Sequence, residues 1–122
     1  MSAHPSFQTE IEFELPKGYL DETSTLHRRG TMRLATAADE ILPLRDPRVQ
    51  QNEAYLAVIV LARVITKLGT LPDIHTGVIE GLFASDLAYL ERLYEKFNGD
   101  EAEPEGRPEK RPLRRINAVG EA

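Results

Sequence analysis

The first part of the chain alternates between apolar and polar residues. Residues 7–15, FQTEIEFEL, place Phe7, Ile11, Phe13 and Leu15 on one side and three glutamates on the other. A period of two over this length is typical of a β-strand with one buried face. We therefore predict a strand whose apolar side packs on a core and whose acidic side faces solvent.

A second alternating segment, LHRRGTMRL at residues 26–34, follows a polar stretch with two turn formers, Pro16 and Gly18. Its apolar side consists of Leu26, Met32 and Leu34, and its polar side of His27, Arg29, Thr31 and Arg33. Gly30, in its middle, indicates a bulge or close packing. Antiparallel pairing with the acidic strand would place opposite charges side by side, each pair contributing about 0.2–1 kcal/mol. We therefore predict a hairpin with a long turn.

After residue 34 the pattern favours a short helix. Thr36 is a good N-cap, and Asp39 and Glu40 fall in the following first turn, where carboxylates favour the helix dipole. The apolar side of this helix consists of Ile41, Leu42 and Leu44. Pro43 and the Asp46–Pro47 pair limit its length, because proline lacks a backbone N–H and disfavours a helical residue before it.

The longest apolar segment predicts a helix from about Asn52 to Leu68, ended by Gly69. Its polar stripe is interrupted by Leu56 and Ile59, where a surface helix would have charged residues. A helix that is apolar on all sides is buried, either in its own core or in an interface. We interpret Leu56, Ile59 and Arg63 as a partner-binding surface, with the free edge of the hairpin as a further candidate.

The last apolar segment, from Ile79 to the stop at Asn98–Gly99, predicts either one helix or two helices broken near Ala84, with Ser85 as the cap of the second. Asp86 lies near the edge of the apolar stripe and has two interpretations. It is either a first-turn acid after the cap, or a charge that pairs with an arginine and pins the helix to the hairpin. The candidate arginines are Arg33, Arg45 and Arg48. Both roles are structural.

Candidate chemistry is sparse in this sequence. The three histidines, His4, His27 and His75, lie far apart, whereas a metal site needs three or four converging ligands. We interpret His75 as a loop or capping residue. Asp39 and Glu40 could form a carboxylate pair for acid–base catalysis, but adjacent helix positions point about 100° apart. We therefore expect no catalytic residue, no bound metal and no cofactor.

Length and charge narrow the class of protein. With 122 residues we expect one domain, over residues 7–99, after a flexible N-terminus of residues 1–6. The chain has no cysteine, which fits a reducing cytoplasm, and its net charge of −5 argues against nucleic-acid binding. The longest apolar run, residues 54–62, is too short to span a membrane. We expect a cytoplasmic α+β protein, an N-terminal β-hairpin packed on a small bundle of two to four α-helices.

Residues 100–122 differ in composition from the rest. They contain three prolines, six acids and five bases, and almost no apolar residue before Leu113. Such a segment buries too little apolar surface to offset its ordering entropy, so we predict a disordered charged tail. We interpret its basic cluster, RPEKRPLRR at residues 107–115, as part of that solvated tail. The alternative is a short partner-binding segment around Leu113 to Val119.

The segments of the chain follow one another in a particular order, which is a hairpin, then MRLATAADEI, then a buried helix and finally GLFASDLAYLERLYEKF. In this order the chain resembles the Mu-like tail assembly chaperone family of contractile-tailed phages. It is also similar to relatives of that family in phage-derived contractile injection systems. In the family a short strand ends in a Leu–Arg or Arg–Leu pair, followed by small residues, a Thr and an acid that opens a helix. The matching residues here are Arg33, Leu34, Thr36 and Asp39, and, in the late helix, Asp86, Leu87 and Leu90. The resemblance spans residues 8–98, while the long hairpin turn and the charged tail depart from the family pattern.

This resemblance implies a non-enzymatic assembly factor that holds tape-measure or tube subunits while a contractile tail forms. The expected partners are tail tape-measure, tube or baseplate proteins, and a homo-oligomer is left open. One alternative is a permanent small structural component of the baseplate or tube end. A small enzyme or metal protein is the third hypothesis.

Overall fold

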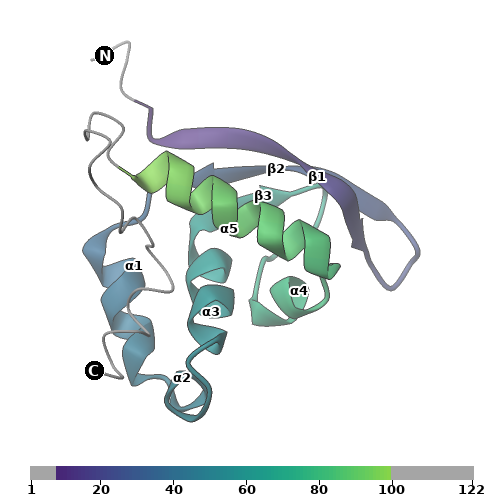
Figure 1. Cartoon of the computed structure of the whole chain (residues 1–122). Coiled ribbons are helices and arrows are strands. Elements are labelled where there is room, and N and C mark those ends of the chain that lie inside the picture. The colour runs from purple at the N-terminus through teal and green to yellow at the C-terminus, as the bar shows by residue number, and fades with distance from the viewer. Residues whose placement is uncertain (1–7, 100–122) are drawn as a thin grey trace.

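A three-stranded antiparallel sheet with helices gathered on one side of it forms the molecule (Figure 1). The structure, a computed structural model, describes residues 8–99, so the predictions for residues 1–6 and 100–122 lie outside the described residues. The strands, in the sheet order β1-β2-β3, are β1 (Glu10–Leu20), β2 (Leu26–Arg33) and β3 (Ile65–Leu68). The helices are α1 (Ala37–Ile41), a 3-10 helix η1 (Leu42–Arg45), α2 (Pro47–Gln51), α3 (Tyr55–Val64), α4 (Thr76–Glu80) and α5 (Ala84–Asn98). The predicted α+β class, with an N-terminal hairpin packed on helices, is confirmed. The described residues form five α-helices instead of the predicted two to four, and a third strand joins the hairpin.

The alternation of the first strand is confirmed, but the strand is longer than predicted. Phe13 and Leu15 are buried, and Glu14 on the opposite face is paired in register with Arg29 of β2. The strand then continues through Pro16 and Gly18, so the prediction that these two residues form a turn is wrong. Gly18 accommodates the extension because its φ of 105° is open to glycine and strained for other residues.

A bulge interrupts the hairpin between Glu14 and Tyr19, where β1 advances five residues while β2 advances two. The backbone groups released there find side-chain partners, as buried polar groups require. Arg28 Nε donates to the carbonyl oxygen of Leu15 at 3.0 Å. The fully buried carboxylate of Asp86 accepts hydrogen bonds from the backbone N–H groups of Lys17 at 3.0 Å and Gly18 at 2.7 Å.

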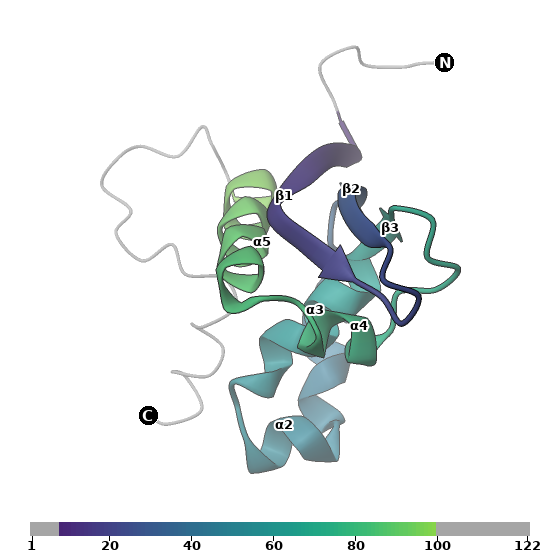
Figure 2. The same cartoon turned by 90° about the vertical axis from the view of Figure 1, so that its right-hand side faces the viewer.

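Asp86 therefore pins α5 to the hairpin, which lies alongside this helix (Figure 2). Its partners are backbone amides of the bulge and not one of the three arginines considered from the sequence. The break between the last two helices is confirmed, because α4 ends at Glu80 and α5 begins at Ala84. Ser85 does not cap α5, whose N-cap is Phe83. His75 caps α4, with Nδ1 accepting from the N–H of Gly77 at 3.1 Å.

His27 is buried, whereas the alternation predicts it on the solvent-facing polar side of its strand, because the hairpin turn and the loop after β3 cover its ring. Nε2 lies 2.8 Å from Asp21 Oδ2, and Nδ1 accepts a hydrogen bond from the N–H of Thr70 at 3.2 Å. The ring must therefore be the neutral tautomer with its proton on Nε2. A Cβ at Gly69 would lie 2.1 Å from Nδ1, so only glycine fits beneath the ring. His27 thus joins the hairpin turn to the loop after β3.

The predicted long helix ends at Val64, and its last part forms a strand instead. Residues 65–68 form β3, in which Lys67 pairs with Thr31 of β2. Val64, Ile65 and Thr66 are three consecutive β-branched residues, which lose side-chain freedom in a helix and fit a pleated sheet. The open edge of β2 supplies partners for them, and this tertiary pairing outweighs the helical pattern.

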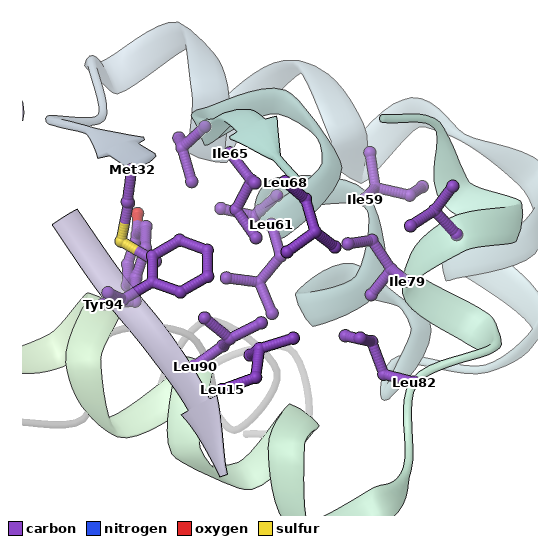
Figure 3. Close-up of a cluster of buried hydrophobic side chains, with 14 of the residues drawn as sticks. Leu15, Met32, Ile59, Leu61, Ile65, Leu68, Ile79, Leu82, Leu90 and Tyr94 are labelled. Carbon is purple, nitrogen blue, oxygen red and sulfur yellow. The ribbon is translucent and has the colours of Figure 1, made fainter. Parts of the chain in front are cut away.

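Leu56 and Ile59 belong to the core, so the prediction that they present an outward-facing surface is wrong. Leu56 is fully buried and Ile59 is 8% exposed. Figure 3 shows Ile59 beside Ile79 of α4, within a cluster of side chains from the sheet, α3, α4 and α5. Since α3 is covered on several sides by its own chain, its all-round apolar character is explained without a partner.

A buried carboxylate, Asp39, joins α1 to the sheet and to α3. Its side chain is 3% exposed and lies 2.8 Å from Arg33 Nη1 and 2.9 Å from Arg63 Nε. It also accepts a hydrogen bond from the N–H of Thr36 at 2.7 Å, which confirms Thr36 as the N-cap in a capping box. Arg63, predicted to contact a partner, is therefore engaged within the chain.

Replacement of Asp86 by Asn should destabilise the fold without changing its shape. The amide keeps one acceptor oxygen but turns an N–H₂ group toward a backbone donor, leaving a buried amide unsatisfied. We expect a loss of about 1–3 kcal/mol in the free energy of unfolding, measured by urea denaturation. The exposed Glu12→Gln variant makes the same charge change and should lie within about 0.5 kcal/mol of the wild type. Equal stabilities for the two variants would contradict the role of Asp86.

Acidification should weaken the anchor at Asp39. Arg33, then the backbone of Thr36 and the side chain of Arg63, hold the pKa of this carboxyl well below its usual range, against the opposing effect of burial. A lowered folded-state pKa means that the stabilisation is complete above the ordinary aspartate value of 3.8 and is lost as pH falls below it.

Asp39→Asn should cost about 2–4 kcal/mol at pH 7, somewhat less than a fully buried ion pair because both arginines are partly exposed. Between pH 7 and pH 2, the unfolding free energy of the variant should fall less than that of the wild type. Urea denaturation at a series of pH values measures both slopes. Parallel pH profiles would show that Asp39 does not contribute to acid sensitivity.

Candidate functional site

The most prominent exposed apolar surface in the described part of the chain lies on α1 and η1. Ile41 is 58% exposed, Leu42 45% and Leu44 37%. These three residues, here called the apolar ridge, account for half of the six large hydrophobic side chains that are exposed within residues 8–99. The ridge is therefore the leading candidate for contact with another surface.

The local sequence explains why the ridge is exposed. Pro43 ends α1 after little more than one turn, and the chain continues as a 3-10 helix in which residues three apart share a side. Pro43 itself is buried, so Ile41 and Leu44 project outward on either side of it. The sequence signal for this site is a short apolar run interrupted by a proline, ILPL at residues 41–44. Such a run is too short to bury all of its apolar side chains, so some of them remain exposed.

Contacts between α1 and the rest of the molecule hold the ridge in place. Asp39 fixes the start of α1 through its two arginines, and the next residue, Glu40, accepts a hydrogen bond from the buried hydroxyl of Tyr94 in α5. Burial, followed by this hydrogen bond, raises the pKa of Tyr94 well above its usual range, so the hydroxyl remains a donor at any physiological pH. At the other end, the side chain of Asp46 caps α2 by accepting from the N–H of Arg48 at 2.8 Å. A surface ordered in advance loses little conformational entropy when it binds.

A smaller apolar pair lies at the far end of the hairpin. Leu20 is 53% exposed and Leu26 50%, and the two are register partners across the turn. In this hairpin-end pair, Leu26 covers Gly18, since a Cβ there would lie 2.9 Å from its side chain. Part of Leu26 thus serves the local turn, and two side chains offer less free apolar surface than the three of the ridge.

The outer face of the sheet forms a shallow hollow with charges of both signs. Its lining consists of Glu12, Phe13, Glu14, Arg29, Gly30, Thr31, Lys67 and Tyr89. The carboxylates lie on β1 and Arg29 on β2, as the alternating pattern predicted, while Lys67 is added by β3, which the sequence did not predict. Because charges of both signs line the hollow, it has no concentrated field of one sign that would select a charged ligand.

The buried titratable side chains of the described residues, His27, Asp39 and Asp86, are engaged in structural contacts. The Asp21–His27 pair has the arrangement of a catalytic dyad, but His27 is 3% exposed and both ring nitrogens are occupied by Asp21 and Thr70. Neither nitrogen faces a substrate. Within residues 8–99, no three histidine or acidic side chains are grouped as metal ligands. No helix among the described elements is long and apolar enough to cross a membrane.

Comparison with known proteins identifies no relative of this chain. A scan against protein-family models finds no match, and searches of curated proteins and of solved structures find no significant match either.

Proposed function

We propose that this protein is a non-enzymatic assembly factor, or chaperone, for a phage-type contractile tail or injection system. On this proposal it acts in the cytoplasm and holds tape-measure or tube subunits through the apolar ridge. The observation that supports it is the ridge itself, three aliphatic side chains exposed on a helix that Asp39 and Tyr94 hold in place. The sequence resemblance described above supplies the class of partner.

The size of the ridge favours transient binding over permanent assembly. Full burial of one aliphatic side chain is worth roughly 1.5–3 kcal/mol, and each ridge residue is only about half exposed before binding. Three such residues therefore contribute a few kcal/mol, against an association cost of roughly 4–15 kcal/mol that other contacts must also offset. A contact of this strength suits a protein that must release its partner.

The hairpin-end pair supports a second candidate function. Leu20 ends β1 and Leu26 begins β2, and the turn that joins these strands lies on the opposite side of the molecule from α1 (Figure 1). The molecule therefore has two separate exposed apolar surfaces. A permanent component of the baseplate or tube end would need two such points, because it is held between two neighbours. In that case both apolar surfaces would be covered in the finished particle.

A ridge variant tests the proposed binding surface. Ile41→Glu combined with Leu44→Glu should remain folded by circular dichroism, because both side chains are already exposed, and should lose at least about tenfold in affinity for tape-measure or tube subunits. The matched control is Leu20→Glu combined with Leu26→Glu, which makes the same change on leucines of similar exposure and should bind as the wild type does. Capture from cells that express the whole tail operon, followed by mass spectrometry, measures the difference. Undiminished capture by a folded ridge variant would contradict the assignment of the ridge.

Purified particles distinguish the two candidate functions. A chaperone should be captured with tail subunits from the cell extract and be missing from finished particles. A structural component should be present in particles at a fixed copy number. The absence of any tail protein from the captured material, together with the absence of this protein from particles, would contradict both.

A further inference from the structure

The described chain ends beside the helix that carries the ridge. Asn98, the last residue of α5, accepts a hydrogen bond from the N–H of Ala35 at 2.9 Å through Oδ1 and donates to the carbonyl oxygen of Tyr94 at 3.0 Å. Ala35 lies just before α1, so α5 ends next to the point where α1 begins (Figure 1). From there, the rise of α1 and η1 places the ridge roughly 6–15 Å further along.

The sequence beyond Gly99 has one short apolar motif. Apart from alanine and proline, the only apolar side chains in residues 100–122 are Leu113, Ile116 and Val119, each three positions from the next. This motif lies in the short segment for which partner binding is the alternative interpretation. None of its features is used by the function proposed above.

We propose that the segment Leu113–Val119 docks on the apolar ridge of the same molecule. Its three apolar side chains match the ridge, Ile41, Leu42 and Leu44, in number and chemistry. A chain of the length from Gly99 to Leu113 can reach roughly 20 Å even at random-coil dimensions, which is comparable with the separation to be bridged. A tether of that length gives an effective concentration in the millimolar range, so a contact too weak to form between separate molecules is well populated within one chain.

Docking would make the segment a competitor for the binding surface. A tail subunit that uses the ridge must first displace residues 113–119, and its apparent affinity falls by the fraction of molecules in which the ridge is free. This consequence rests on the proposed function, whereas the docking itself does not. The segment would also shield the ridge from nonspecific association when no subunit is present.

Paramagnetic relaxation in the full-length chain tests the docking. Because the sequence has no cysteine, a nitroxide on Ala118→Cys is attached at a unique position. In the ¹⁵N-labelled protein it should broaden the amide signals of residues 41, 42 and 44, and leave those of Leu20 and Leu26 sharp. Adding Leu113→Asp and Ile116→Asp to the labelled chain should restore the ridge signals. Broadening that is equal at the two places, or that survives these substitutions, would overturn the proposal.

A mixed sample identifies the occupant of the ridge. When ¹⁵N-labelled protein without nitroxide is mixed with nitroxide-labelled protein at natural isotope abundance, intramolecular docking predicts sharp ridge signals. If the ridge signals broaden in this mixture as strongly as when ¹⁵N and nitroxide are on the same chain, a second copy occupies the ridge. That result also overturns the proposal.

Capture of tail subunits separates this inference from the proposed function. The full-length Leu113→Asp, Ile116→Asp variant should bind tail subunits roughly two- to tenfold more tightly than the wild type, because the competitor is lost. Ridge broadening without any captured tail protein would refute the proposed function and leave docking intact. Capture that is unchanged by these substitutions, with no ridge broadening in the nitroxide experiment, would refute docking and leave the function intact.

Discussion

The carboxylate of Asp39 is the interaction on which the surface features of this protein depend. A buried charge is tolerated only when it is paired and hydrogen-bonded, and Asp39 meets this requirement with Arg33 of β2, Arg63 of α3 and the backbone of Thr36. Each partner comes from a different element, so one side chain fixes the sheet, α3 and the start of α1 relative to one another. The apolar ridge follows directly on α1, and its position is a consequence of this pairing.

A second buried aspartate, Asp86, plays a corresponding role at the start of α5. Asp86 holds the first turn of that helix against the hairpin bulge, while Asn98 holds its last turn against Ala35. With both ends fixed, α5 crosses the molecule and brings the end of the described chain next to α1 (Figure 1). The two aspartates therefore decide together where the ridge lies and which part of the chain is tethered beside it.

These contacts show how a small domain uses its buried polar side chains, which hold short elements in place. Within the described residues, its large apolar side chains are divided between a closed core and exposed positions on the ridge, at the end of the hairpin and at Phe83. The ridge gathers three of the exposed ones on one short stretch of chain, and an apolar surface of this size is suited to reversible contact.

Local patterns in the sequence determined much of this protein. The strand face of Phe13 and Leu15, the cap at Thr36, the break near Ala84 and the α+β class all follow from periodicity and capping, which act over a few residues. Four features were decided only by tertiary structure: the burial of His27 under the loop after β3, the third strand at residues 65–68, the burial of Leu56 and Ile59, and the exposure of the ridge. In each case the outcome depends on a partner distant in sequence. A β-branched segment becomes a strand only where β2 has an open edge, and an apolar side chain is buried only where another element covers it. Periodicity shows which side chains need a partner, whereas the folded chain decides which of them find one.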